Sequence, residues 1–204
     1  MTGSPSPPLL GVVANPVSAR DIRRVVANAG NLQITDRVNI VLRMLQAARA
    51  AGVARALLMP DRGGIRALLE RHLKRGDSTL PAIDWLDFEP TSTVEDSFTA
   101  ARLLQAAGAR AIVVLGGDGT HRAVVRELAE RPDAPPIAGL STGTNNAFPE
   151  MREPTITGLA AGLFAAGRIA ADQALVPNKL LEVLIQPRDG GPQRRDIAIV
   201  DAVI

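Results

Sequence analysis

The residues best suited to chemistry form one short run, Gly116-Gly117-Asp118-Gly119-Thr120, directly after the apolar segment 112–115. The apolar segment indicates a buried strand, and the pattern after residue 120 indicates a helix. Glycines let a ligand approach the backbone closely, and a helix start presents unpaired N–H groups and a positive dipole end. The run therefore predicts a phosphate-binding site. It fits neither common phosphate motif, because its first two glycines are adjacent and no Lys-Ser/Thr pair follows.

Asp118 places a negative charge inside this predicted anion site. Phosphates would repel an unpaired carboxylate, so we expect it to face a metal ion or a hydroxyl group whose proton it accepts. Asp-Gly pairs also occur in ordinary turns, where the Asp accepts backbone N–H groups. We predict that Asp118 is either the catalytic base of a phosphoryl transfer or the carboxylate that faces Mg²⁺.

Two other polar segments also follow predicted strands. The first contains Asn15 and Ser18 and comes after segment 9–14; Asn-Pro by itself is typical of a turn. The second comes after segment 137–140 and is richer in polar groups than a simple loop needs. We interpret it as a ligand-binding segment, because adjacent amides can contact both a ribose and an adenine edge. Its candidate residues are Thr142, Gly143, Thr144, Asn145 and Asn146.

In their order and spacing, these three segments resemble the superfamily of NAD kinase, diacylglycerol kinase and 6-phosphofructokinase, whose signature is Gly-Gly-Asp-Gly-Thr. Lipid kinases of this superfamily carry an Asn-Pro-x-Ser-Gly turn in the place of residues 15–18, and Gly-Thr-x-Asn-Asp in the place of residues 143–147. The whole pattern is most similar to the ATP-NAD kinase-like branch, which includes the acetoin-catabolism X proteins. The resemblance covers nearly the whole chain after Leu9.

This resemblance implies an ATP-dependent kinase that uses Mg²⁺ and phosphorylates a hydroxyl group. The first candidate acceptor is the 2′-hydroxyl of the adenosine ribose of NAD, which would give NADP. It implies that Asn15 and Ser18 contact ATP. Gly116, Gly117 and Gly119 would leave room for phosphates, and Thr120 would bind them or cap the following helix. The alternatives are a lipid kinase acting on diacylglycerol or a sphingoid base, and a non-catalytic nucleotide-binding protein. No amphipathic membrane-binding helix supports the lipid kinase.

The rest of the chain alternates apolar strand patterns with helical patterns. We expect strands at 9–14, 54–59, 82–88, 111–115 and 137–140, and helices at 36–51, 65–74, 94–107 and 121–131. This alternation predicts an α/β fold with a doubly wound, mostly parallel sheet. Ligands of such sheets bind beyond the carboxyl ends of the strands, where one crevice would gather Asn15, Asp61, Asp118 and Ser141.

A different pattern follows Pro154. We expect a helix at 155–166 and then a hairpin of two strands, 180–186 and 196–204, around Asp189-Gly190-Gly191. This divides the chain into a tail at 1–8, a nucleotide-binding domain at 9–170 and the start of an antiparallel β-rich domain at 171–204. Because the sequence stops within an apolar strand, we expect a truncated chain. Its exposed strands would either pair with a second copy, giving a homo-oligomer, or be poorly ordered. The 204 residues alone would be inactive.

Composition excludes several classes of protein. The absence of cysteine excludes disulfides and thiolate metal sites. An aromatic content of 2% disfavours a nucleic-acid-binding protein. Apolar runs of strand length predict no membrane span, and three prolines without a basic segment in the first ten residues predict no signal peptide. We therefore expect a cytoplasmic protein that binds small molecules.

The pI of 9.9 reflects the predominance of arginine among the basic residues, since the net charge is only +2. Arg20, Arg23 and Arg24 form one tight basic cluster, either a solvated helix face or a contact to nucleotide phosphates. His121 is a possible proton relay, although a histidine near a helix start is more often exposed. His72 is expected to face solvent.

Overall fold

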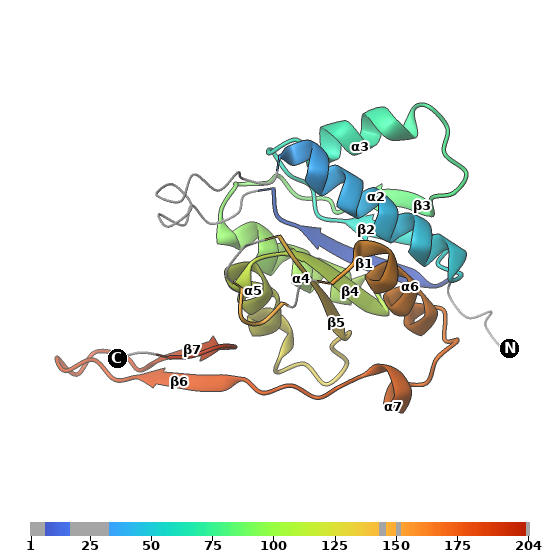
Figure 1. The fold of residues 1–204 in the computed structure, drawn as a ribbon. Coiled ribbons are helices and arrows are strands. Elements are labelled where there is room, and N and C mark those ends of the chain that lie inside the picture. Colours follow the sequence, from blue (N-terminus) through green and yellow to red (C-terminus); the bar gives the residue numbers. More distant parts are fainter. Residues whose placement is uncertain (1–6, 17–32, 143–145, 150–151, 203–204) are drawn as a thin grey trace, which may run out of the picture.

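The computed structural model describes residues 7–16, 33–142, 146–149 and 152–202. Its centre is a five-stranded sheet in the order β3-β2-β1-β4-β5, in which every pairing is parallel (Figure 1). This confirms the predicted α/β class. The strands are β1 (Leu9–Ala14), β2 (Arg55–Leu58), β3 (Ala82–Trp85), β4 (Ala111–Gly116) and β5 (Ile137–Ser141).

The two central strands, β1 and β4, are buried along their whole length. They are continuous apolar runs, as expected for strands that are covered on both faces. Val12 pairs with Val113, and Val13 with Val114. The chain builds outward from β1 in both directions, so the strand order reverses between β1 and β4. Such a reversal is the point at which ligands bind in open α/β sheets.

Helices cover both faces of the sheet (Figure 1). α2 (Ile34–Ala50), α3 (Ile65–Leu73) and α6 (Pro154–Ala165) form one layer, and α4 (Val94–Ala106) and α5 (Asp118–Leu128) form the other. Alternate residues of each strand enter opposite cores. Val12 and Val113 pack in the first core, while Val13 and Val114 pack in the second. The sheet is therefore doubly wound, as predicted.

The packing of α6 on α2 depends on two glycines. A Cβ at Gly158 would lie 2.1 Å from the backbone oxygen of Met44, and one at Gly162 would lie 2.7 Å from the Cβ of Ala51. These positions let the two helices approach closely at the backbone. They explain why α6, which is rich in alanine and glycine, forms part of the core instead of a loose surface helix.

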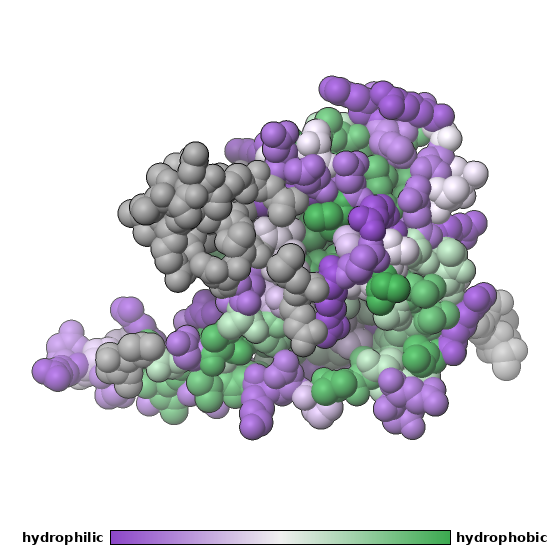
Figure 2. All heavy atoms as spheres, viewed as in Figure 1, coloured by the Kyte–Doolittle hydropathy of each residue, from purple (hydrophilic) through white to green (hydrophobic). Residues whose placement is uncertain are grey.

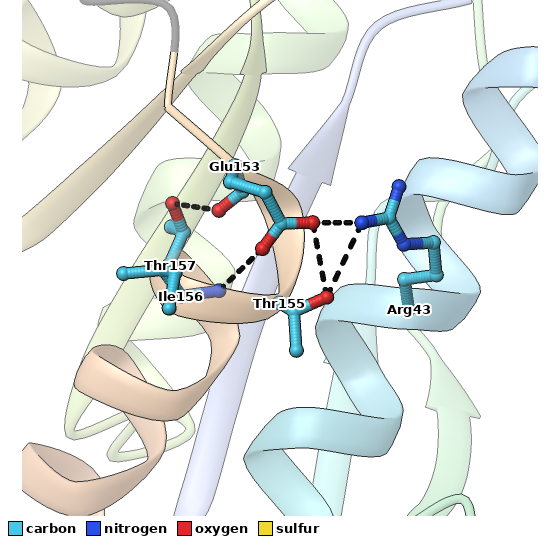
Figure 3. Close-up of polar contacts among 5 residues, drawn as sticks. All are labelled: Arg43, Glu153, Thr155, Ile156 and Thr157. Atoms are coloured by element: carbon cyan, nitrogen blue, oxygen red, sulfur yellow. Dashed lines mark hydrogen bonds and ion pairs between the residues drawn. The ribbon is translucent and has the colours of Figure 1, made fainter.

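Glu153 fixes the start of α6 (Figure 3). Its carboxylate accepts the backbone N–H of Ile156 at 2.9 Å and the hydroxyl of Thr155 at 3.0 Å. It also forms an ion pair with Arg43 of α2. Pro154 occupies the first helical turn, where its missing N–H costs nothing. The chain after β5 is thereby anchored to the helix that follows β1.

A small antiparallel sheet follows α7 (Ala171–Ala174) and consists of β6 (Leu181–Ile185) and β7 (Arg194–Ala198). It confirms the predicted hairpin. However, β7 begins and ends earlier than predicted. It starts at Arg194, which pairs with Ile185, although the first apolar residue of the strand is Ile197. Apolar residues of β6 are exposed, Leu184 to 57%, and the hydrophobic surface along the lower edge of Figure 2 includes them. Val203 and Ile204 lie outside the described residues.

Arg122 joins the hairpin to the main domain. Its Nε donates to the backbone oxygen of Ile197 at 2.7 Å, and its guanidinium forms an ion pair with Asp196. Arg122 lies on α5, one residue after His121. The hairpin therefore docks on the helix that begins at the Gly-Gly-Asp-Gly-Thr run. The division of the chain at residue 170 into two domains stays a prediction.

Candidate functional site

The candidate site lies where three neighbouring strands end, across the reversal between β1 and β4. The N–H of Asn15, after β1, donates to the carbonyl of Leu115 at 3.0 Å, and the N–H of Thr142, after β5, donates to the carbonyl of Gly116 at 3.3 Å. The three chain segments predicted to bind nucleotide therefore meet at one edge of the sheet, and their backbones are joined by hydrogen bonds.

The Gly-Gly-Asp-Gly-Thr run is the end of a strand followed by the first turn of a helix. Gly116 ends β4, Gly117 is the extended N-cap of α5, and residues 118–120 are already helical. The N–H groups of Thr120 and His121 both donate to the carbonyl of Gly117. The predicted helix start at residue 121 was therefore wrong by three residues. An Asp in the first turn is favourable because it lies at the positive end of the helix dipole.

Two of the three glycines in the run allow close packing, and the third borders open space. Gly117 has a φ of −96°, and none of the three has a positive φ, so no strained backbone requires glycine here. A Cβ at Gly116 would lie 2.6 Å from Thr120, and one at Gly117 would lie 3.0 Å from the Oδ1 of Asn146. At Gly119, by contrast, no heavy atom of the described residues lies within 4 Å of a Cβ, so the space beside the helix start is open.

The carboxylate of Asp118 is paired. One oxygen accepts the N–H of Ala147 and the other the N–H of Phe148, each at 3.0 Å. The alternative in which Asp118 accepts backbone N–H groups is therefore observed, although the donors come from the loop after β5 and not from the turn of Asp118 itself. A carboxylate has about four acceptor positions, so two bonds leave room for a metal ion or a hydroxyl group. The catalytic and metal-binding roles of Asp118 stay predictions.

Asn15 connects the turn after β1 to α5. Its Nδ2 donates to the hydroxyl oxygen of Thr120 at 3.0 Å, and Thr120 is buried. Thr120 therefore does not cap α5, since Gly117 takes that position. On the opposite side, the Nδ2 of Asn146 donates to the hydroxyl oxygen of Ser141 at 2.8 Å. Of the predicted contacts, Ser18, Gly143, Thr144 and Asn145 lie outside the described residues, as do Arg20, Arg23 and Arg24.

Arg37 is part of the site and was not predicted. Its side chain is 1% exposed, and its Nη1 donates both to the backbone oxygen of Asn15 and to the hydroxyl oxygen of Thr142, each at 3.1 Å. The signal in the sequence is an arginine within the apolar face of α2, in phase with Val41 and Leu45. A buried guanidinium needs hydrogen-bonding partners. It places a positive charge behind the site, between the ends of β1 and β5.

Asp61 was expected to join this group and instead caps α3. Its carboxylate accepts the N–H groups of Ile65 at 3.1 Å and Arg66 at 2.7 Å. The loop that carries it still borders the site, because a Cβ at Gly63 would overlap the ring of Pro16 at 2.3 Å. The structure therefore brings this loop beside the turn after β1, while the carboxylate of Asp61 is used by the helix start.

The two histidines lie in different environments. His121 is fully buried, and burial lowers the pKa of its imidazole despite the backbone of Gly117, the charge of Asp118 and the backbone of Val114, which raise it. The expectation that it is exposed was wrong, because its position on α5 faces the sheet. His72 is half-buried, with its Nε2 3.0 Å from the carboxylate of Asp77.

Within the described residues, no group of three or more His, Cys, Asp or Glu side chains could hold a metal ion. One carboxylate beside a phosphate site still fits Mg²⁺, which proteins often hold through one or two carboxylates, water and substrate phosphates. Among the helices of the described residues, none is long and apolar enough to cross a membrane.

Comparison with known proteins agrees with this geometry. Residues 10–169 match the family of the ATP-NAD kinase N-terminal domain. The chain is also 62% identical over 200 residues to the acetoin catabolism protein X of Cupriavidus necator. That alignment covers 97% of this chain and 54% of the relative, so the chain spans about half the length of the curated relative it matches. These matches confirm the resemblance that the three segments indicated.

Proposed function

The chain belongs to the ATP-NAD kinase family, and from this premise we propose that it binds ATP with Mg²⁺ and transfers the γ-phosphoryl group to a hydroxyl group. The proposed acceptor is the 2′-hydroxyl of the adenosine ribose of NAD, which gives NADP. The observation that carries the proposal is the junction of the three strand ends, where α5 begins beside Arg37, Asn15 and Thr142.

The donor phosphates are proposed to lie at the N-terminus of α5. This helix has 11 residues, and its first N–H groups and dipole favour an anion. The open space at Gly119 lets phosphate oxygens approach the backbone, while Arg37 contributes a positive charge from the protein interior. Mg²⁺, when bound, neutralises charge on the phosphates during transfer. Asp118 is the residue that would hold it or accept a proton.

In the transfer, Asp118 is proposed to accept the proton of the attacking hydroxyl group. The new O–P bond forms to the γ-phosphorus as the bond to the β-phosphate oxygen breaks, and ADP leaves. The two N–H groups of residues 147 and 148 fix the orientation of the carboxylate. Because the chain spans about half of its curated relative, the acceptor, the reaction and any partner of the whole protein are part of this proposal.

The pairing of Asp118 also supports a second candidate, a non-catalytic nucleotide-binding protein. Two backbone N–H groups already use the carboxylate, so the residue would serve only to join the turn after β4 to the loop after β5. Such a protein would bind ATP and transfer nothing. The two candidates therefore predict the same binding and a different turnover.

The experiment uses the full-length protein, because this chain spans about half the length of its curated relative. It compares the unaltered protein and two variants in a mixture of ATP, Mg²⁺ and NAD, and measures NADP formation. Replacing Asp118 by Asn removes the charge and keeps the shape, so turnover is expected to fall by roughly 10²–10⁴-fold. Asp172→Asn is the matched control, since Asp172 is exposed on α7, and it is expected to keep full turnover. ATP binding without turnover in the unaltered protein would favour the second candidate. Diacylglycerol in place of NAD tests the lipid-kinase alternative.

A further inference from the structure

His121 is a buried polar side chain that the proposed reaction does not use. Its exposed fraction is 0%, and its ring lies between the first turn of α5, the middle of β5 and the loop that follows β5. Its Nδ1 is 2.9 Å from the carbonyl oxygen of Gly117, and its ring centroid is 5.8 Å from that of Phe148. The ring therefore contacts segments from two strand ends of the site.

The hydrogen bond to Gly117 fixes the form of the imidazole. A carbonyl oxygen only accepts hydrogen bonds, so Nδ1 carries a hydrogen. Burial favours the neutral ring, in which Nε2 then carries the lone pair. Nε2 is buried and has no hydrogen-bond partner among the described residues. A buried acceptor without a partner costs stability, so this ring is not simply a well-satisfied core side chain. A buried polar atom without a partner in a folded protein therefore suggests a role beyond packing.

β5 leaves space for the ring at one position. A Cβ at Gly139 would lie 2.9 Å from the Nε2 of His121 and 3.2 Å from the Cβ of Pro149. Glycine inside a strand weakens it and often marks a close approach. Here the approach is that of the imidazole, which fills the place of the missing side chain. His121 and Gly139 are therefore matched in size across two elements.

The ring contacts one residue next to Asp118 in the chain and one of the two residues that hold its carboxylate. Gly117, whose carbonyl accepts the Nδ1–H, directly precedes Asp118. Phe148, whose ring packs on the imidazole, donates its backbone N–H to the carboxylate of Asp118 at 3.0 Å. The imidazole thus contacts the residue that begins the helix and the residue that holds the carboxylate.

We propose that His121 is a positioning residue for Asp118: its neutral ring locks the turn after β4 against the loop after β5 and so holds the carboxylate in one orientation. The orienting role is a property of the folded chain and is tested without catalysis. Only its effect on phosphoryl transfer rests on the proposed function.

The first test is the ring itself. The chain has two histidines, so nitrogen NMR spectra of the protein and of His72→Gln assign both rings. For His121 at pH 7.5 we expect the tautomer with hydrogen on Nδ1, and no titration in the range where an exposed histidine titrates. A hydrogen on Nε2 of the neutral ring, or titration of His121 in the same pH range as an exposed histidine, would overturn the proposal.

The second test is hydrogen exchange at the backbone amides of residues 147 and 148, which needs neither nucleotide nor turnover. His121→Leu keeps volume and removes the donor, whereas His121→Asn keeps a donor near the place of Nδ1. We expect exchange at both amides to be about tenfold faster in His121→Leu and close to normal in His121→Asn. Gly139→Ala, which displaces the ring, should act like His121→Leu. Unchanged exchange in His121→Leu, in a variant that melts normally, would refute the orienting role.

The third test concerns catalysis. Misplacement of a catalytic group costs up to roughly 100-fold in rate, so kcat should fall in His121→Leu while KM for ATP changes little, and His121→Asn should recover most of kcat. If kcat falls equally in both variants, and by an amount that follows the fall in their melting temperatures, His121 is a packing residue only. Absence of turnover in the unaltered full-length protein would refute the proposed function and leave the exchange result as the test of His121.

Discussion

Replacement of Arg37 by methionine should weaken the binding of nucleotide much more than it lowers the stability of the protein. The guanidinium is 1% exposed and donates to the backbone oxygen of Asn15 and the hydroxyl of Thr142. Hydrogen bonds from charged donors are each worth about 1.5–3 kcal/mol. Burying the cation costs several kcal/mol, which offsets this gain. We therefore expect the free energy of unfolding to change by less than about 2 kcal/mol.

The affinity for ATP–Mg²⁺ should change much more than the stability. Without Arg37, the turns after β1 and β5 lose their shared partner, and the phosphate site loses a positive charge in a region of low dielectric constant. We expect Kd to rise by at least about tenfold, which corresponds to about 1.4 kcal/mol. Isothermal titration with ATP–Mg²⁺ measures the affinity, and thermal melting measures the stability.

Arg43→Met is the matched control for Arg37→Met. Arg43 lies on the same helix, and its ion pair with Glu153 is exposed to solvent (Figure 3). Surface ion pairs contribute about 0–1 kcal/mol to stability, so this variant should keep both its melting temperature and its affinity for ATP. Normal ATP affinity in Arg37→Met, or an equal loss in Arg43→Met, would refute the assignment of Arg37 to the site.

Three further predictions follow from the same contacts. In Gly116→Ala the new Cβ would lie 2.6 Å from Thr120, so the free energy of unfolding should fall by about 1–3 kcal/mol. In Gly119→Ala the new Cβ would meet open space, so ATP binding should weaken with little change in melting temperature. A stable Gly116→Ala together with normal ATP binding by Gly119→Ala would contradict the proposed phosphate site. Burial lowers the pKa of His121 from its ordinary value of 6.5, so the unfolded chain binds the proton more readily. Stability should therefore fall as pH drops below about 6.5, by up to about 1.4 kcal/mol per pH unit; the same slope in melts of His121→Asn would reject this cause. Finally, we propose that the exposed apolar residues of β6 pair the chain into a homo-oligomer, so Leu184→Lys should lower the mass measured by light scattering, and a monomeric unaltered protein would contradict this.

The sequence predicted the sheet because its signals were local and strong. β1 and β4 are unbroken apolar runs, and the helices between strands carry a regular apolar face, so strand type and the parallel arrangement follow from pattern alone. Gly52 and Gly108 end their helices with a positive φ, as a glycine in that position does. The bounds of β7 were wrong because charged residues, including Arg194, pair along the hairpin and hide the apolar alternation.

The parts of the site that sequence reasoning missed depend on contacts between distant segments. The pairing of Asp118 uses backbone N–H groups about 30 residues further along the chain, and backbone donors leave no trace in residue types. His121 was misjudged because a helix start is usually exposed, whereas here the imidazole in the first turn of α5 packs against Gly139 of β5. Arg37 did leave a signal, a cation within an apolar helix face, which a strict reading of the periodicity would have found.

The position of the nucleotide is tested most directly by a hydrogen-exchange map of the protein with and without ATP–Mg²⁺. If the nucleotide binds at the ends of β1, β4 and β5, exchange should slow in segments 115–121 and 141–148 and in the turn at Asn15. Exchange in β3, β6 and β7 should not change. Protection confined to other elements, or no protection at nucleotide concentrations well above millimolar, would contradict this position of the nucleotide.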